Sequence, residues 1–204
     1  ETEERASQLA TLNSVAQSLA STLELDVLLE RIVSSACGIL KAEAGSLLLT
    51  EAETGDLIFR VTYGPVAGDL IGRRLRPGTG FAGEAASTGL AVIVNDVHKD
   101  SRWFGDSDQQ TGFTTRALMA APMLIKNRII GVLEVINKAD GSGFNEYDQN
   151  LVTAFAGQAA VAIENARLYT LTDRALSERV DELSTLQRIT RDLSVVLDIN
   201  RVLE

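Results

Sequence analysis

Residues 116–138 read RALMAAPMLIKNRIIGVLEVINK, which is two apolar runs on either side of the short polar segment Lys126-Asn127-Arg128. Apolar runs that are separated by a short polar turn are typical of two paired antiparallel strands. We therefore predict one strand over 116–125 and a second over 129–137, joined as a hairpin.

A second hairpin is predicted upstream, where residues 46–50 and 57–63 flank the turn Glu53-Thr54-Gly55-Asp56. Further elements are expected between the hairpins: short strands over 73–76 and 91–94, and a short helix between Gly80 and Gly89. The repeated strand–helix–strand pattern of a doubly wound nucleotide-binding fold is missing from this order. The sequence therefore predicts an α+β body in which helices pack on an antiparallel sheet.

Helices are predicted on both sides of the sheet-forming region. Asp26 is expected to N-cap a helix whose apolar stripe packs on the sheet and consists of Leu28, Leu29, Ile32, Val33, Ala36, Ile39 and Leu40. After the strands, Asn145 and Asp148 have the spacing of a capping box. Because residues 158–204 contain neither Gly nor Pro, we predict one long exit helix.

Both ends of the chain carry an apolar seam. Apolar residues recur in coiled-coil spacing over Leu9, Leu12, Ala16, Leu19 and Leu23, and again over Leu176, Val180, Leu183 and Leu186. We therefore predict long N- and C-terminal dimerisation helices and a parallel homodimer that is held by these helices.

The two ends of the chain also resemble each other. Residues 9–30 and 183–204 share seven identical aligned residues, which favours a second copy of the module that begins near the end of this sequence. The alternative is that two leucine-rich helices match through their composition alone. We divide the chain into a coiled-coil or linker helix (1–26), a globular domain (27–170), and a connecting helix with the start of a second repeat (171–204).

The composition excludes several classes of function. The 204 residues include 28 acidic and 19 basic ones, and the net charge of −9 repels nucleic acid and anionic membrane surfaces. No apolar run reaches the ~20 residues of a membrane span and the N-terminus is unlike a signal peptide, so we expect a cytoplasmic protein. One cysteine and one histidine are too few for an internal disulfide or for a zinc or iron–sulfur site. We expect Cys37 in the core, His98 in a solvated loop, and no metal or bound cofactor.

Several motifs together resemble one protein family. They are the strand over 130–136, the pair Asn137-Lys138 that follows it, then Phe144 and Asp148, and the upstream segment TGFTTR at 111–116. This combination is similar to the GAF domain, in particular to the tandem regulatory copies in cyclic-nucleotide phosphodiesterases and some bacterial adenylyl cyclases. The resemblance covers roughly residues 27–170. It implies a PAS-like fold with a six-stranded antiparallel sheet, a small-molecule pocket on one face of that sheet, and a parallel dimer.

The resemblance also implies which residues would bind a cyclic nucleotide, cAMP or cGMP. Aromatic side chains would stack on the purine, while hydroxyl and N–H groups would hold the ribose and the cyclic phosphate. The implied ligand-binding residues are Ser46, Thr62, Tyr63, Phe81, Ala82, Phe104, Asp108, Thr111, Thr115 and Glu134. Tyr63 and Thr62 stand where the family shows Phe and Asp, and this departure leaves the base selectivity open.

Two of the motifs have a chemical interpretation of their own. Residues 78–83, GTGFAG, lead into the predicted short helix, so that unpaired N–H groups would converge on an anion such as phosphate. The alternative is that this glycine-rich segment only reverses the direction of the chain. From the residues alone, Lys138 is expected to pair with Asp148 beneath the pocket floor and Phe144 to fill the core, whereas the resemblance implies that Asn137, Lys138, Phe144 and Asp148 shape the pocket. The family's Glu at the end of this motif is replaced by Gln149.

Three hypotheses for the function follow. The chain is a regulatory module of a multidomain signalling protein that binds a cyclic nucleotide and transmits the signal through dimeric helices. Alternatively, it serves only for dimerisation and signal transmission, or it senses another small molecule. An enzyme is disfavoured, because no nucleophile–base pair and no cluster of catalytic carboxylates is recognisable.

Overall fold

The computed structural model describes residues 25–65, 68–103 and 105–202. The strands are β1 (Ala42–Thr50), β2 (Leu57–Tyr63), β3 (Arg74–Leu75), β4 (Val92–Val94), β5 (Leu118–Ile125) and β6 (Arg128–Lys138). The helices are one over 25–40, α2 (Gly80–Thr88), the 3-10 helix η1 (Val97–Lys99), α3 (Asp106–Thr111) and α4 (Glu146–Val202). Within this described part of the chain, none of the helices combines the length and the apolar character that crossing a bilayer requires.

The six strands form one sheet in the order β3-β2-β1-β6-β5-β4, and every neighbouring pair is antiparallel. Both predicted hairpins are confirmed, as are the fold class and the six-stranded sheet. The β5–β6 hairpin turns at Lys126 and Asn127, which both have positive φ (46° and 66°), as a tight two-residue hairpin turn requires. The central pair β1–β6 joins the two hairpins, and the short strands β3 and β4 form the edges of the sheet.

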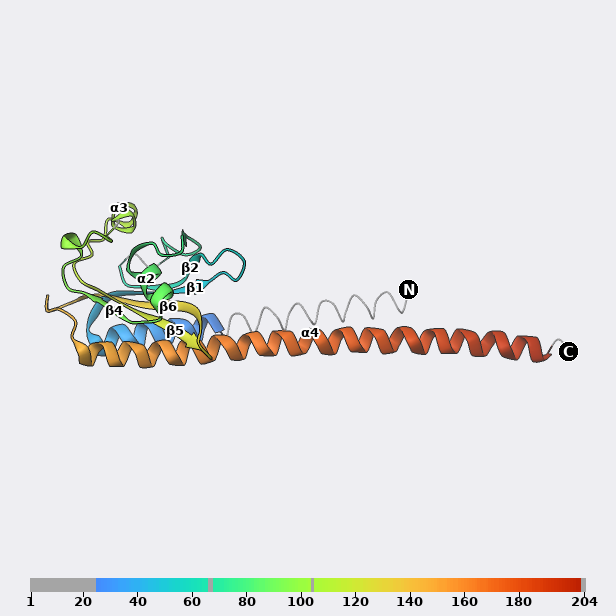
Figure 1. The fold of residues 1–204 in the computed structure, drawn as a ribbon. Helices are drawn as coiled ribbons and strands as arrows, with labels where there is room; N and C mark the ends of the chain where they lie inside the picture. The colour runs from blue at the N-terminus through green and yellow to red at the C-terminus, as the bar shows by residue number, and fades with distance from the viewer. Residues whose placement is uncertain (1–24, 66–67, 104, 203–204) are drawn as a thin grey trace. The chain divides into compact units, whose positions relative to one another are not determined.

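One face of the sheet is covered by the helix over 25–40 and by the first part of α4 (Figure 1). Buried side chains from both helices and from the sheet form one apolar cluster there, which includes Leu29, Val33, Leu47, Leu133 and Val152. The predicted stripe of the first helix is too broad, because Leu28 and Ile39 are 44% and 59% exposed.

The predicted N-cap at Asp26 is wrong. Asp26 lies inside the helix, which already includes residue 25. The Asp26 carboxylate instead accepts hydrogen bonds from Nε and Nη2 of Arg60 on β2, at 2.8 and 2.9 Å.

The opposite face carries α2 and a second buried cluster, which includes Leu48, Phe59, Phe81 and Val132. The β1–β2 register skips Arg60, because Leu47 pairs with Val61 whereas Leu48 pairs with Phe59. A skipped residue is a β-bulge and breaks the alternation of side chains between the two faces. Phe59 therefore belongs to the cluster on the α2 face, while Val61 belongs to the cluster under the helices.

Residues 165–204 are a compact unit of their own, which consists of the continuation of α4 as far as Val202. The long exit helix is therefore confirmed. Three residues of its predicted seam, Leu176, Val180 and Leu183, are 63%, 54% and 60% exposed. The N-terminal seam from Leu9 to Leu23 and residues 9–24 of the repeat at 9–30 lie outside the described residues, so both stay predictions.

Gly45 on β1 lets the first helix approach the sheet closely. A Cβ atom at this position would lie 2.6 Å from Sγ of Cys37 and 3.0 Å from the carbonyl oxygen of Glu134. We expect Gly45→Ala to lower the free energy of unfolding by roughly 1–3 kcal/mol, because the helix must move away from the sheet. Urea denaturation would measure this loss.

Gly38 is the matched control, because a Cβ atom there meets nothing within 4 Å and the residue lies in the helix over 25–40. Gly38→Ala should raise stability by about 0.5–1 kcal/mol through helix propensity. Equal effects of the two substitutions would contradict the close packing at Gly45.

Candidate functional site

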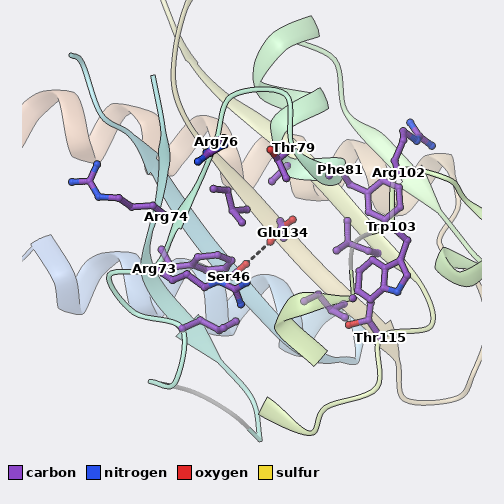
Figure 2. Close-up of a pocket in the computed structure, with 18 residues that line it drawn as sticks. Ser46, Arg73, Arg74, Arg76, Thr79, Phe81, Arg102, Trp103, Thr115 and Glu134 are labelled. Carbon is purple, nitrogen blue, oxygen red and sulfur yellow. Dashed lines mark hydrogen bonds between the residues drawn. The ribbon is translucent and has the colours of Figure 1, made fainter. Parts of the chain in front are cut away.

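A cavity of about 500 Å³ opens on the α2 face of the sheet. Its lining comes from β1, β2, β5, β6, β3 with the residues on either side of it, the start of α2 and the segment that precedes β5 (Figure 2). The lining residues are Ser46, Phe59, Leu70, Arg73, Arg74, Leu75, Arg76, Thr79, Gly80, Phe81, Ala82, Arg102, Trp103, Gly105, Thr115, Leu118, Glu134 and Ile136.

The floor of the cavity carries a buried carboxylate. Glu134 on β6 and Ser46 on β1 are register partners, and the Ser46 hydroxyl donates to Oε2 of Glu134 at 2.6 Å. The two residues are 6% and 3% exposed. Burial raises the pKa of Glu134 to about 6, although the Ser46 hydrogen bond opposes this shift. The other carboxylate oxygen, Oε1, accepts no hydrogen bond from the described residues, so it can accept one from a ligand.

The start of α2 supplies backbone donors. Thr79 is the N-cap residue but makes no side-chain cap, and the first turn contains no acidic residue. The first helical N–H groups, those of Gly80, Phe81 and Ala82, have no intrahelical acceptor, and all three residues line the cavity. Together with the positive end of the helix dipole, these groups favour an anion.

Stacked aromatic side chains form a wall of the cavity beside α2. The rings of Phe81 and Trp103 are stacked with their centroids 6.2 Å apart, and His98 meets Trp103 edge-on. The Arg102 guanidinium lies 5.1 Å from the centroid of the Phe81 ring and forms ion pairs with Glu84 on α2 and with Asp100. Such a wall offers a planar apolar surface to a flat ligand.

The arginines of the cavity were not predicted from the sequence. Arg73, Arg74 and Arg76 come from β3 and the residues that flank it, and Arg102 comes from the segment before α3. The signal in the sequence was three arginines within the four residues 73–76 of an acidic chain. Their place at the cavity depends on β3, which borders it.

Five of the ten predicted ligand-binding residues line the cavity: Ser46, Phe81, Ala82, Thr115 and Glu134. Phe104 lies outside the described residues. The remaining four are not among the lining residues: Thr62, Tyr63, Asp108 and Thr111. The ligand-binding role of all ten stays a prediction.

Three of these four residues make other contacts in the same region. The Thr62 hydroxyl accepts the N–H of Gly68 at 2.7 Å. Asp108 accepts both the N–H and the hydroxyl of Thr115, each at 2.7 Å, and so holds a lining residue in place. The Thr111 hydroxyl accepts the N–H of Phe113. Tyr63, beyond the bulge, is 42% exposed.

Asn137 organises the end of β6. It is 1% exposed and adopts a left-handed conformation with φ of 52°. Its Oδ1 accepts the N–H groups of Arg116 and Ala117, and its Nδ2 donates to Glu43 and to the carbonyl of Thr114. The side-chain hydrogen bonds that Asn137 and Arg116 donate to the Glu43 carboxylate lower the pKa of Glu43.

The pair predicted between Lys138 and Asp148 is present, whereas the pocket-shaping role of the motif stays a prediction. Nζ of Lys138 is 2.6 Å from Oδ2 of Asp148, and Phe144 is buried. Asn145 and Asp148 exchange backbone-to-side-chain hydrogen bonds of 2.9 and 3.1 Å, which confirms the capping box at the start of α4. Gln149, in place of the family's Glu, donates to the carbonyl of Ala91.

Cys37 and His98 take the positions expected for them. Cys37 is buried in the cluster under the helices, and burial raises the pKa of its thiol to about 12, so it is not a reactive thiolate at neutral pH. His98 is exposed in η1.

Comparison with known proteins agrees with the family resemblance of the sequence. A family model described as GAF domain matches residues 24–163. The chain is 28% identical over 157 residues to a probable 3',5'-cyclic phosphodiesterase, pde-5, of Caenorhabditis elegans, which covers 72% of this chain and 21% of that protein. It is also 28% identical over 165 residues to the dual 3',5'-cyclic-AMP and -GMP phosphodiesterase 11 of Drosophila melanogaster. This match covers 74% of this chain and 11% of that protein. The chain thus spans about a fifth or less of the length of these relatives.

Solved structures with the same fold come from proteins of different function. The GAF domain of a phosphoenolpyruvate-protein phosphotransferase from Coxiella burnetii superposes with a TM-score of 0.64 at 20% identity, over 78% of this chain and 96% of that one. The free methionine-R-sulfoxide reductase of Neisseria meningitidis, solved with its substrate, superposes with a TM-score of 0.59 at 20% identity. This match covers 71% of this chain and 81% of that one. At this identity the likeness shows the fold alone.

The buried Glu134 should make stability depend on pH in a characteristic way. Because its pKa is raised from 4.5 to about 6 in the folded state, its contribution is fully present below pH 4.5 and is lost as the pH rises to about 6. The loss should be about 2 kcal/mol. Glu134→Gln should remove this dependence and be more stable than the wild type at pH 7.5, as measured by denaturant unfolding across pH.

Ser46→Ala is the opposing control. It removes the only hydrogen bond to the carboxylate from the described residues, so it should raise the pKa of Glu134 further and lower stability at pH 7.5 by about 1–3 kcal/mol. If the wild type and Glu134→Gln show the same pH dependence, the carboxylate is solvated and the description of the floor is wrong.

Proposed function

This chain belongs to the GAF domain family, and from that premise we propose that it is a sensing module whose cavity binds a cyclic nucleotide, cAMP or cGMP. The observation that carries the proposal is the division of the cavity into three chemically distinct parts. Glu134 offers a hydrogen-bond acceptor on the floor, Phe81 and Trp103 offer a stacking surface, and the start of α2 offers N–H donors. A nucleotide has a base edge with N–H groups, a flat ring and a phosphate.

The relatives support the same ligand class. The proteins matched in the nematode and the fly are described as phosphodiesterases of 3',5'-cyclic nucleotides, and one of them is described as acting on both cyclic AMP and cyclic GMP. In our proposal the chain is the regulatory part of a larger cytoplasmic signalling protein. The alternatives are a sensor of another small molecule and a module used only for dimerisation.

We propose no catalytic role for the cavity. The Ser46 hydroxyl donates to Glu134, but the described lining contains neither histidine nor cysteine to activate or replace that hydroxyl.

Signal transmission would rely on two segments. Thr115, held by Asp108 and lining the cavity, lies just before β5, and α4 is continuous from Glu146 to Val202. A ligand can shift the helices only if it binds two arrangements of the domain with different affinity.

Nucleotide binding can be followed through Trp103, the only tryptophan of the chain, which lines the cavity. Titration with cAMP or cGMP should change its fluorescence in a saturable way, and calorimetry should give the same affinity. Glu134→Gln should weaken binding about tenfold, because a charge-assisted hydrogen bond to the base becomes a neutral one.

The variant is a sharp test because we expect it to be more stable than the wild type at neutral pH, so that weaker binding cannot reflect unfolding. If neither nucleotide binds at millimolar concentration, the function is one of the alternatives.

We also propose a homodimer through the helical arms. Leu176, Val180 and Leu183 follow each other at the 4-3 spacing of a coiled-coil seam, and all are exposed in the single chain. Leu176→Asp combined with Leu183→Asp should convert a dimer to a monomer in sedimentation equilibrium, with the circular dichroism of the sheet domain retained.

Leu171 provides the matched control. It is 52% exposed but falls outside this seam, so Leu171→Asp should leave the dimer intact. A wild-type chain that sediments as a monomer at micromolar concentration would contradict the proposal.

A further inference from the structure

A four-residue turn between η1 and α3 carries part of the aromatic wall of the cavity. The carbonyl of Asp100 accepts the N–H of Trp103 at 3.1 Å, and Oδ1 of Asp100 accepts the N–H of Arg102 at 3.0 Å. Aspartate is favoured at the first position of a turn because its side chain can bond to the backbone two residues on. Asp100 therefore fixes the backbone from which the Arg102 and Trp103 side chains project.

The Arg102 side chain connects this turn to α2. Its Nε donates to Oδ1 of Asp100 at 2.8 Å, its Nη2 donates to Oδ2 of the same carboxylate, and its Nη1 donates to Oε2 of Glu84 on α2. The hydrogen bonds from Arg102 lower the pKa of Asp100 to about 2, so this carboxylate is ionised at neutral pH. One planar guanidinium thus bridges two carboxylates that belong to different segments.

This bridge passes over an aromatic ring. Phe81 and Glu84 are three residues apart on α2 and are therefore neighbours on one face of the helix. The Arg102 guanidinium lies 5.1 Å from the centroid of the Phe81 ring, and the Trp103 ring is stacked on Phe81 with the centroids 6.2 Å apart. Figure 2 shows the Phe81 ring between Arg102 and Trp103. Two consecutive residues of the turn therefore hold the same ring of α2, one through its charge and the other through its aromatic face.

The partners of Arg102 lie outside the cavity. Arg102 is one of the lining residues, but neither Glu84 nor Asp100 is among them. In Figure 2 the Arg102 guanidinium points away from Glu134 on the floor. Because its nitrogens are already bonded to carboxylates of the protein, Arg102 is better suited to hold the wall in place than to bind a ligand.

From these contacts we propose that Arg102 is a positioning residue, which ties the turn 100–103 to α2 and thereby holds Trp103 in place as the stacking surface for a flat ligand. The inference rests on the proposed ligand-binding role of the cavity, but it does not require the ligand to be a cyclic nucleotide. Arg102 acts on the affinity for the ligand through the placement of Trp103.

The fluorescence of Trp103 tests this placement without any ligand, because Trp103 is the only tryptophan of the chain. Arg102→Gln and Glu84→Gln should each lower the fluorescence anisotropy of Trp103. Each should also raise its quenching by acrylamide about twofold, because the turn opens more often once the bridge is broken. The urea midpoint of unfolding should hardly change, since exposed ion pairs add little to global stability.

Nucleotide affinity separates positioning from direct contact. Glu84→Gln removes a carboxylate that competes with an anionic ligand for Arg102, so a direct contact between Arg102 and the phosphate predicts tighter binding by this variant. Positioning predicts the opposite sign. In calorimetric titrations with cAMP or cGMP, we expect Glu84→Gln to weaken binding about threefold and Arg102→Gln about tenfold.

Arg60→Gln is the matched control. The side chains of Arg60 and Arg102 are both 40% exposed, and Arg60 likewise forms two hydrogen bonds to one carboxylate, that of Asp26, but Arg60 does not line the cavity. Arg60→Gln should keep the Trp103 anisotropy and the nucleotide affinity of the wild type.

Two results would overturn the proposal: wild-type anisotropy and quenching in Arg102→Gln, or tighter nucleotide binding by Glu84→Gln. The proposed function can fail separately. If both variants change the fluorescence of Trp103 as expected while neither cyclic nucleotide binds to the wild type, the positioning role of Arg102 stands and the cyclic-nucleotide function fails.

Discussion

The side-chain amide of Asn137 connects three segments that are distant in the chain. It bonds to Glu43 on β1 and to the backbone of residues 114–117, which precede β5, and it lies at the end of β6. All four of its hydrogen-bonding positions are filled, which is what burial of an amide requires. Thr115, bounded by Thr114 on one side and held by Asp108 on the other, is therefore fixed at the wall of the cavity.

Much of the architecture follows from local patterns in the sequence. The turn at Lys126-Asn127 and the apolar runs around it predict the β5–β6 hairpin, and the pair Asn145 and Asp148 predicts where α4 begins. These features depend on residues close together in the chain, so the sequence carries them directly. Asp26 shows the limit of such reasoning, because its partner Arg60 lies on a strand whose position only the folded chain defines.

The candidate site was less accessible from the sequence. The bulge at Arg60 changes which side chains of β2 face the cavity, and no local pattern predicts it. The arginines of β3 were visible in the sequence, but their role depends on a two-residue strand pairing with β2 at the border of the cavity. Glu134 was assigned through the family resemblance, whereas its hydrogen bond to Ser46 follows from the register of β1 against β6.

The two edge strands are short, and this limits the pairing of strands between copies of the domain. β3 has two residues and β4 has three, so each free edge offers only a few backbone groups to a passing strand. Long exposed edges are templates on which sheets of neighbouring molecules join and aggregate. Copies of this domain that are crowded together along a chain or within an assembly would gain little from exchanging strands. The blunt edges therefore protect its solubility at high local concentration.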